Sequence, residues 1–399
     1  MTKRKLLLLG GSAQQVIAIE KAKRLGLSTV LCDYLPDNPG QYIADQFYLI
    51  STTDKEAVLD VARKEKIDGI IAYASDPAAP TAAYVAEKLG LQTNPYESVN
   101  ILCNKDLFRE FLHQNGFHSP KACGYGSIQD ALNDIGEFAL PIIIKPVDSS
   151  GSKGVTVMHR LDGMEDALRF AFSFSRNKKI VIEEFIEKNH PYLIGGDVFV
   201  IDGKIVLWGL LNCHRDDRVN KLVPVGKSYP LILDEKDTEA VHHTLQLMVD
   251  KLGIKQGAMN VELVVDKNHC VWPIDVGPRN GGNMIPDLLG MIFDVDVVEM
   301  SICAAMGDLH KPIIKSGSPY FATHNLHSCK DGVYSKILFD RTIEKYIVKK
   351  CLYKKEGDRV EFFDNASKAL GIIFLRFNTS FEMTEILNNI YDHITIVLK

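Results

Sequence analysis

Residues 142–155 read IIIKPVDSSGSKGV, in which an apolar run ends at Lys145 and a stretch of serines and glycines follows before a second β-branched run. Lysine is a compact cation with three donors, and it suits phosphate oxygens. Residues of little bulk let a hairpin loop fold closely over a polyphosphate and donate hydrogen bonds to it; here they are Ser149, Ser150, Gly151, Ser152 and Gly154. A solvated hairpin turn explains the same letters, so both interpretations stand at this point.

The composition is that of an ordinary globular protein, with 399 residues, 46% hydrophobic and 24% charged, which suggests two or three domains. A net charge of -5 argues against binding nucleic acid by bulk electrostatics. The apolar run Leu6–Leu9 is too short for a secretory signal, and no stretch reaches the roughly 18 apolar residues of a membrane span. Eight scattered cysteines without a C-x-x-C pair indicate reduced thiols, and we expect a cytoplasmic protein.

The first 95 residues alternate between short apolar runs and amphipathic helical segments, which predicts βαβ units and a parallel sheet. Gly10-Gly11-Ser12 precedes a helix, as in a dinucleotide site, but the G-x-G-x-x-G spacing is absent. A nicotinamide-dependent oxidoreductase is therefore the least favoured reading. The loop either presents amides to an anion or is a tight turn.

The pattern becomes mixed after residue 96, where strands pair as hairpins and helices lie between them, so we predict an α+β unit. From residue 315 the chain carries short β runs and two helix candidates, at 340–351 and 380–390.

Two pairs of carboxylates lie on apolar strands. Glu183 and Glu184 lie in the run IVIEEFI, before Phe185 and Ile186, where they either read an adenine and its ribose or face solvent. Glu262 and Asp275 lie on two strands of one predicted hairpin. If residues 266–269 form its turn, position 265 faces 270 and position 262 faces 273, which makes the two carboxylates diagonal neighbours. Such a pair repels unless a cation such as Mg²⁺ lies between its members. A one-residue slip in register would break this deduction and leave two carboxylates at a sheet rim.

The run GPRNGGN at residues 277–283 follows directly and places Arg279 in a glycine-rich loop. The planar guanidinium suits a phosphate or a carboxylate. An exposed surface loop is the alternative.

The order of Lys105, Lys145 with its loop, Glu183-Glu184, Glu262, Asp275 and Arg279 resembles the ATP-grasp superfamily over nearly the whole chain. It is most similar to the carboxylate–amine ligases, which include L-amino-acid ligases and formyl-phosphate-forming purine enzymes. The resemblance implies three parts: a Rossmann-like domain at 1–95, an ATP-grasp core at 96–314 and a C-terminal α+β domain at 315–399. The core would divide into a first lobe at 105–186 with the phosphate loop and a second lobe at 187–314 with the metal site.

The resemblance also implies a role for each of these residues. Lys105 and Lys145 would contact the ATP phosphates, with Lys145 and Arg279 as the catalytic pair. The segment from Ser149 to Val155 would close over the phosphates. The remaining implied ligands are Glu183, Glu184, Phe185 and Ile186 for adenine, Asp197 for the ribose, and Glu262 and Asp275 for Mg²⁺, with Mn²⁺ as an alternative. Gly277 departs from the family because it stands where an asparagine metal ligand is common, which leaves a second metal to water or Asn283.

The implied activity is ATP-dependent ligation, in which a carboxylate becomes an acyl phosphate and then reacts with an amine. Small-molecule acids and amines would be the partners, with no nucleic acid or membrane, and a homodimer is left open. Candidate substrate residues in the polar run HRDDRVNK are His214, Arg215, Arg218 and Lys221, although a solvated loop is equally consistent. Two alternatives remain: a formyl-phosphate or carboxylase-type enzyme acting on a nucleotide precursor, and a non-catalytic ATP-binding regulator.

Overall fold

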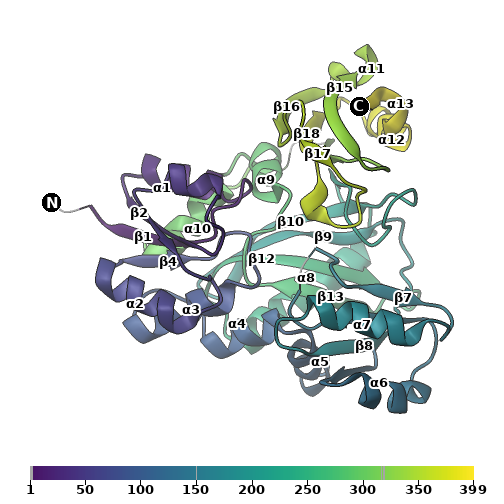
Figure 1. The fold of residues 1–399 in the computed structure, drawn as a ribbon, viewed down its shortest axis with the longest axis horizontal. Helices are drawn as coiled ribbons and strands as arrows, with labels where there is room; N and C mark the ends of the chain where they lie inside the picture. Colours follow the sequence, from purple (N-terminus) through teal and green to yellow (C-terminus); the bar gives the residue numbers. More distant parts are fainter. Residues whose placement is uncertain (1–2, 150, 316, 318–319) are drawn as a thin grey trace.

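The computed structural model describes residues 3–149, 151–315, 317 and 320–399 (Figure 1). The N-terminal part is a parallel four-stranded sheet of order β3-β2-β1-β4, as the alternating pattern predicts. Its strands are β1 (Lys5–Leu9), β2 (Ser28–Asp33), β3 (Gln46–Leu49) and β4 (Gly69–Ile71). The loop after β1 is tied to β2, because the Gly11 amide donates to the Asp33 carboxylate at 2.7 Å.

Helices cover both faces of this sheet, which explains why β1 is apolar at successive positions. Leu7 and Leu9 pack toward α2 (Lys55–Glu65), α3 (Ala79–Leu89) and α4 (Tyr96–Cys103). Leu6 and Leu8 pack toward α1 (Val16–Arg24) and α10 (Val297–Met306). Because α10 comes from a much later part of the chain, the N-terminal sheet is completed by residues beyond position 95.

The first lobe is a second four-stranded sheet, of order β5-β8-β6-β7, at the lower right of Figure 1. Its strands are β5 (Ala122–Tyr125), β6 (Ile142–Pro146), β7 (Thr156–Met158) and β8 (Ile180–Glu184). The accompanying helices are α5 (Lys105–Gln114), α6 (Ile128–Asp134) and α7 (Met164–Phe174). The predicted hairpin is confirmed, because β6 and β7 are antiparallel neighbours and the serine- and glycine-rich loop joins them.

The second lobe is built on an antiparallel sheet of eight strands, in the order β13-β12-β9-β10-β11-β14-β18-β16. These strands are β9 (Leu193–Ile201), β10 (Lys204–His214), β11 (Gly226–Tyr229), β12 (Gln256–Val265), β13 (Val271–Gly277), β14 (Phe321–Leu326), β16 (Ile347–Leu352) and β18 (Gly371–Arg376). Helix α8 (Glu235–Leu252) packs on one face and α9 (Ile285–Phe293) on the other. Since β14 pairs with β11, the sheet runs across residue 315, and the division of the chain into domains stays a prediction.

The C-terminal part adds a small sheet of β17 (Arg359–Val360), β15 (Gly332–Phe339) and β19 (Ile394–Leu398), at the top of Figure 1. Its helices are α11 (Arg341–Glu344), α12 (Ser380–Asn388) and α13 (Ile390–His393), with the short 3-10 turn η3 (Ala366–Lys368). Elsewhere in the described chain, 3-10 turns lie at η1 (Pro39–Tyr42), after β2, and at η2 (Ile135–Glu137), after α6. The helix predicted at 380–390 is confirmed for most of its length. The helix predicted at 340–351 is wrong beyond Glu344, because residues 347–352 alternate in burial as strand β16.

The hairpin of β12 and β13 has a different register from the predicted one. Val265 faces Val271 rather than Cys270, and an irregularity beside Glu262 shifts the register by one further residue. Glu262 therefore faces Asp275 directly instead of diagonally. The predicted neighbourhood of the two carboxylates is confirmed, although the reason is a β-bulge that the pattern of apolar residues does not reveal.

Within the described residues, no helix is long and apolar enough to cross a membrane.

Candidate active site

Lys145 lies at the end of β6 and is buried against strand β8. Ile143 faces Glu183 across the two strands, so Lys145 is a diagonal neighbour of Glu183 on the same face. Its Nζ donates to Glu183 Oε2 at 2.7 Å. Burial lowers the pKa of Lys145, which Glu183 partly offsets. The ammonium group is thus held in one place by a charged partner.

Arg109 completes this ion-pair network, although it is not among the residues predicted from the sequence. Its Nε donates to Glu183 Oε1 at 2.9 Å, and its terminal nitrogens donate to the carbonyls of Pro273 and Ile274 at 3.0 and 2.7 Å. The side chain is 4% exposed and so lies within the core. Arg109 therefore links the first lobe to the strand that carries Asp275. Its one signal in the sequence is a place on the apolar face of α5, between Phe108 and Leu112.

We expected Glu183 to contact adenine, and that contact stays a prediction. Both of its oxygens accept hydrogen bonds from Lys145 and Arg109, and the residue is 2% exposed. Burial by itself would raise the pKa of Glu183, but the two cations lower it to about 2. Glu183 is thus the counter-ion of Lys145. Its neighbour Glu184 is partly exposed and accepts from the Ala139 amide at 3.0 Å.

The following segment leaves β8 toward the surface. The Phe185 amide donates to the Pro141 carbonyl at 2.9 Å, while the Phe185 ring is exposed and Ile186 is partly buried. Contact of Glu184, Phe185 and Ile186 with an adenine ring stays a prediction.

The serine- and glycine-rich loop lies against Lys105. Lys105 Nζ donates to the Ser149 carbonyl at 3.0 Å, and Ser149 Oγ donates to the Lys153 carbonyl at 2.9 Å. Gly154 has a φ of +73°, and Val155 after it is partly buried as the chain enters β7. Ser152 Oγ donates to the Leu222 carbonyl at 3.0 Å, so the loop contacts the second lobe. Gly151, at the turn, has a φ of +68°, and Ser150 lies outside the described residues.

Glu262 and Asp275 are partly exposed carboxylates on facing strands. Arg215 Nη2 lies 3.7 Å from Glu262, and Lys105 Nζ lies 3.9 Å from Asp275. Two partly exposed carboxylates on one face of a sheet fit the oxygen ligands that Mg²⁺ prefers. The residues present therefore fit a divalent cation between the two strands.

Arg279 lies in the loop after β13 and forms a bidentate ion pair with Asp76 of the N-terminal part. Its Nε donates to Asp76 Oδ1 at 2.6 Å, and its Nη1 donates to the Asn280 carbonyl at 3.1 Å. Burial would lower the pKa of Arg279, but Asp76 raises it above its ordinary value. Asp76 is a second residue that the sequence analysis missed, since nothing in SDPAAP distinguishes it from a turn aspartate.

We expected Asp197 to hold a ribose, and that contact stays a prediction. Its side chain is buried, and its two oxygens accept from the Gly281 amide at 3.0 and 2.8 Å and from Asn260 Nδ2 at 2.8 Å. Burial raises the pKa of Asp197 to about 6. Asp197 therefore anchors the glycine-rich loop that carries Arg279. At the far end of this loop, the Asn283 amide donates to Gln14 Oε1 at 2.8 Å.

Residues 138–287 match the family model of the ATP-grasp domain. The segment 138–287 is therefore an ATP-grasp domain. A formate-dependent phosphoribosylglycinamide formyltransferase from Sulfurisphaera tokodaii is 22% identical over 390 residues, which cover 96% of this chain and 94% of that protein. An L-amino acid ligase from Bacillus licheniformis superposes with a TM-score of 0.82 at 20% identity, over the full length of both chains. A phosphoribosylglycinamide synthetase from Anaerococcus prevotii gives 0.77 at 20% identity, again over both full chains.

The four candidate substrate residues differ in their surroundings. Arg215 lies beside Glu262, as above. His214 Nε2 is hydrogen-bonded to Ser228 Oγ at 2.8 Å, and burial lowers the pKa of His214 to about 4. Arg218 is paired with Asp216 and covers the ring of Tyr391, which makes it a structural link to the C-terminal part. Lys221 is exposed. Of the four, Arg215 has the surroundings that best suit a substrate residue.

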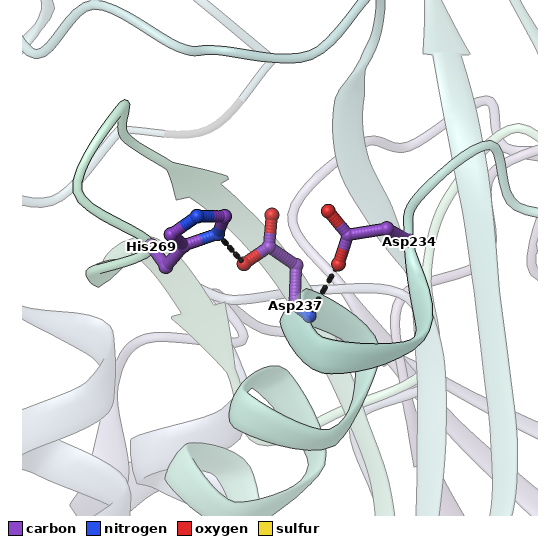
Figure 2. A group of neighbouring side chains, drawn as sticks. All are labelled: Asp234, Asp237 and His269. Atoms are coloured by element: carbon purple, nitrogen blue, oxygen red, sulfur yellow. Dashed lines mark hydrogen bonds and ion pairs between the residues drawn. The ribbon is translucent and has the colours of Figure 1, made fainter.

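One further group of ionisable side chains lies at the start of α8, where Asp234, Asp237 and His269 converge (Figure 2). Asp234 caps the helix by accepting from the Asp237 amide at 2.7 Å, and Asp237 is paired with His269 Nδ1 at 2.7 Å. These contacts account for the cluster as a helix cap, and we assign it no function in the ATP-grasp site.

Proposed function

We propose that this ATP-grasp protein is a ligase that uses ATP to activate a carboxylate as an acyl phosphate and couples it to an amine, releasing ADP and phosphate. The observation that carries the proposal is the convergence of Lys105, Lys145 and Arg279 with the Glu262–Asp275 pair around one junction of the two lobes. Phosphoryl transfer requires positioning and neutralisation of charge more than covalent help from the protein. The described residues supply cations and carboxylates of that kind.

The proposed chemistry balances in two steps. A carboxylate oxygen attacks the γ-phosphorus of ATP, the bond from that phosphorus to the β-bridging oxygen breaks, and ADP leaves. The amine nitrogen then attacks the carbonyl carbon, the carbon–oxygen bond to phosphate breaks, and the nitrogen loses a proton. Lys105 and Lys145 would hold phosphate oxygens, with Glu183 fixing Lys145. Mg²⁺ bound by Glu262 and Asp275 would neutralise phosphate charge.

The loop at 149–155 would exclude water from the acyl phosphate, which would otherwise be hydrolysed. It already contacts Lys105 on one side and residue 222 of the second lobe on the other. A loop that spans the two lobes in this way is suited to cover a bound polyphosphate.

The assay for this function is ADP and phosphate release from MgATP in the presence of pooled carboxylic acids and amines. Release that requires both an acid and an amine supports the ligase. Production of AMP and pyrophosphate would exclude the acyl-phosphate route. Tight ATP binding with no turnover on any pool would favour the regulatory alternative.

A narrower version makes formate the acid and a phosphoribosyl amine the acceptor. Its support is the similarity to the Sulfurisphaera protein, which extends over 96% of this chain instead of the ATP-grasp domain alone. Formate and phosphoribosylglycinamide, which the name of that relative gives, therefore belong in the first pools tested.

Lys145→Met tests the phosphate-binding role. A charge-assisted hydrogen bond contributes about 1.5–3 kcal/mol, so we expect ATP affinity to fall about 10-fold to 100-fold in isothermal titration. Lys204→Met, at the exposed turn of the β9–β10 hairpin, should bind ATP as the unchanged protein does. If Lys145→Met binds ATP as tightly as the natural protein, Lys145 is not part of the nucleotide site.

A further inference from the structure

The ion pair between Arg279 and Asp76 joins two distant parts of the chain. Arg279 follows β13, and Asp76 follows β4 in the N-terminal sheet. The guanidinium uses Nε and Nη2 on the two carboxylate oxygens, and the side chains are 13% and 21% exposed. A bidentate pair shielded from solvent fixes the plane of the guanidinium as well as its charge.

Gly277 creates the space for this contact. A Cβ atom at position 277 would lie nearer to Asp76 Oδ1 than Cβ atoms approach other atoms in folded proteins. The next nearest atoms, Cζ and Nε of Arg279, would be at 3.2 Å, a tight distance that a small shift relieves. The carboxylate of Asp76 thus occupies the volume that a side chain at position 277 would need. Gly277, which departs from the family pattern, and Asp76 therefore depend on each other, because the missing side chain at position 277 leaves the volume that the carboxylate fills.

The pair leaves Arg279 able to bind a further oxygen. A guanidinium has five N–H donors. Asp76 uses two of them and the Asn280 carbonyl uses one, so one N–H remains on each terminal nitrogen. The Asp76 carboxylate on one edge fixes the orientation of the guanidinium, and with the Asn280 carbonyl it still leaves two N–H donors for a further ligand.

We infer that Asp76 is a positioning residue: it fixes Arg279 for the transferring phosphate, and Gly277 is the residue that makes room for it. This inference rests on the proposed function for its catalytic meaning. The N-terminal domain, through Asp76, is then part of the phosphate-transfer site, although Asp76 itself need not touch the nucleotide.

The ion pair can be tested without a substrate. In protein labelled with ¹⁵N-arginine, the Arg279 Nε–H signal, assigned with Arg279→Lys, should exchange slowly with solvent and lose that protection in Asp76→Asn. Asp308→Asn is the matched control, because it breaks a different arginine–aspartate pair, that of Arg4 and Asp308, at the exposed edge of the same two domains. An Arg279 signal that is unchanged in Asp76→Asn would overturn the inference.

The shared space can be tested by a double-mutant cycle in thermal unfolding. Gly277→Ala should lower the unfolding midpoint by several degrees in the natural background and by much less in an Asp76→Gly background. An equal decrease in both backgrounds would show that residues 76 and 277 do not compete for the same volume.

Kinetics test the positioning role, using the acid and amine that give turnover in the pooled assay. Misplacement of a catalytic group by about 1 Å costs on the order of 100-fold, so Asp76→Asn should lower kcat about 10-fold to 100-fold. The KM for ATP should stay within about twofold, Asp76→Glu should regain part of the rate, and Asp308→Asn should match the natural protein. If Asp76→Asn keeps the kcat of the natural protein at a temperature well below its unfolding midpoint, Asp76 has a structural role only. If the natural protein turns over no substrate, the proposed function fails, while the arginine signal and the unfolding cycle still decide the ion pair.

Discussion

Single residues account for the charge balance of the site. Lys145 and Arg109 are buried cations in the first lobe, and Glu183 is the carboxylate that both of them contact. Breaking a buried ion pair from one side leaves an uncompensated charge, which costs about 3–5 kcal/mol. Glu183 therefore has to stay ionised for the lobe to hold its lysine in place.

Glu183→Gln should lower the free energy of unfolding at pH 7 by about 3–5 kcal/mol, because two buried cations lose their partner. Chemical unfolding monitored by circular dichroism measures this change. Glu184→Gln is the matched control, since its amide oxygen can still accept from the Ala139 amide and little change is expected.

The same residue sets an acid limit on stability. The pKa of Glu183 is about 2 in the folded protein and 4.5 for an ordinary glutamate, so ionised Glu183 stabilises the fold above about pH 4.5. That contribution, on the order of 3 kcal/mol, is lost as the pH falls toward 2. Unfolding midpoints between pH 5 and pH 2.5 should therefore fall less steeply in Glu183→Gln than in the natural protein; parallel curves would contradict this account.

At the scale of elements, two hairpins carry residues of the proposed chemistry. The β6–β7 hairpin presents the phosphate loop, and the β12–β13 hairpin presents Glu262 and Asp275. Gly154 ends the phosphate loop with a φ of +73°, and a Cβ there would lie 2.8 Å from Pro146 Cγ and 2.9 Å from Phe174 Cβ. Strain and steric overlap act together at this position.

Gly154→Ala should therefore shift the loop that we propose covers the phosphates and weaken ATP binding about 10-fold in titration calorimetry. Gly126→Ala adds the same methyl group where nothing lies within 4 Å of it, and ATP affinity should not change. If both variants bind ATP equally well, the loop does not contribute to the affinity.

Asp275→Asn removes one charge of the carboxylate pair and keeps its shape. We expect the Mg²⁺ concentration for half-maximal turnover to rise at least about 10-fold, since hard cations prefer ionised oxygens. A metal titration of steady-state ADP release measures it, with Asp266→Asn in the turn of the same hairpin as the control. If the Mg²⁺ dependence of turnover is unchanged in Asp275→Asn, the cation does not bind at this hairpin.

The sequence predicts the elements well and their side-chain partners less well. Lys145, its loop and the two hairpins follow from periodicity and turn residues, which are local. Glu183 and Asp197 were assigned to a nucleotide, but their partners Arg109 and Gly281 come from distant segments, and periodicity does not record them. The pairing of Glu262 with Asp275 depends on a bulge. Asp76 lies in a turn without a distinguishing pattern, so its contact with Arg279 emerges only when the domains are placed together.

At the scale of the whole molecule, the site is an assembly of three parts of the chain. The N-terminal sheet contributes Asp76, the first lobe contributes Lys105 and Lys145, and the second lobe contributes Glu262, Asp275 and Arg279. The C-terminal strands extend the eight-stranded sheet of the second lobe, and Tyr391 contacts Arg218 within the candidate substrate segment. An acid activated at this junction would be surrounded by all of these parts.

The most direct test of the central claim is the fate of the carboxylate oxygen. With an acid labelled by ¹⁸O in its carboxylate, MgATP and an amine that supports turnover, the acyl-phosphate route transfers one labelled oxygen to each inorganic phosphate released. Mass spectrometry of the phosphate should therefore detect one ¹⁸O per molecule, with ADP formed in equal amount. Unlabelled phosphate, or label appearing in AMP, would contradict the account.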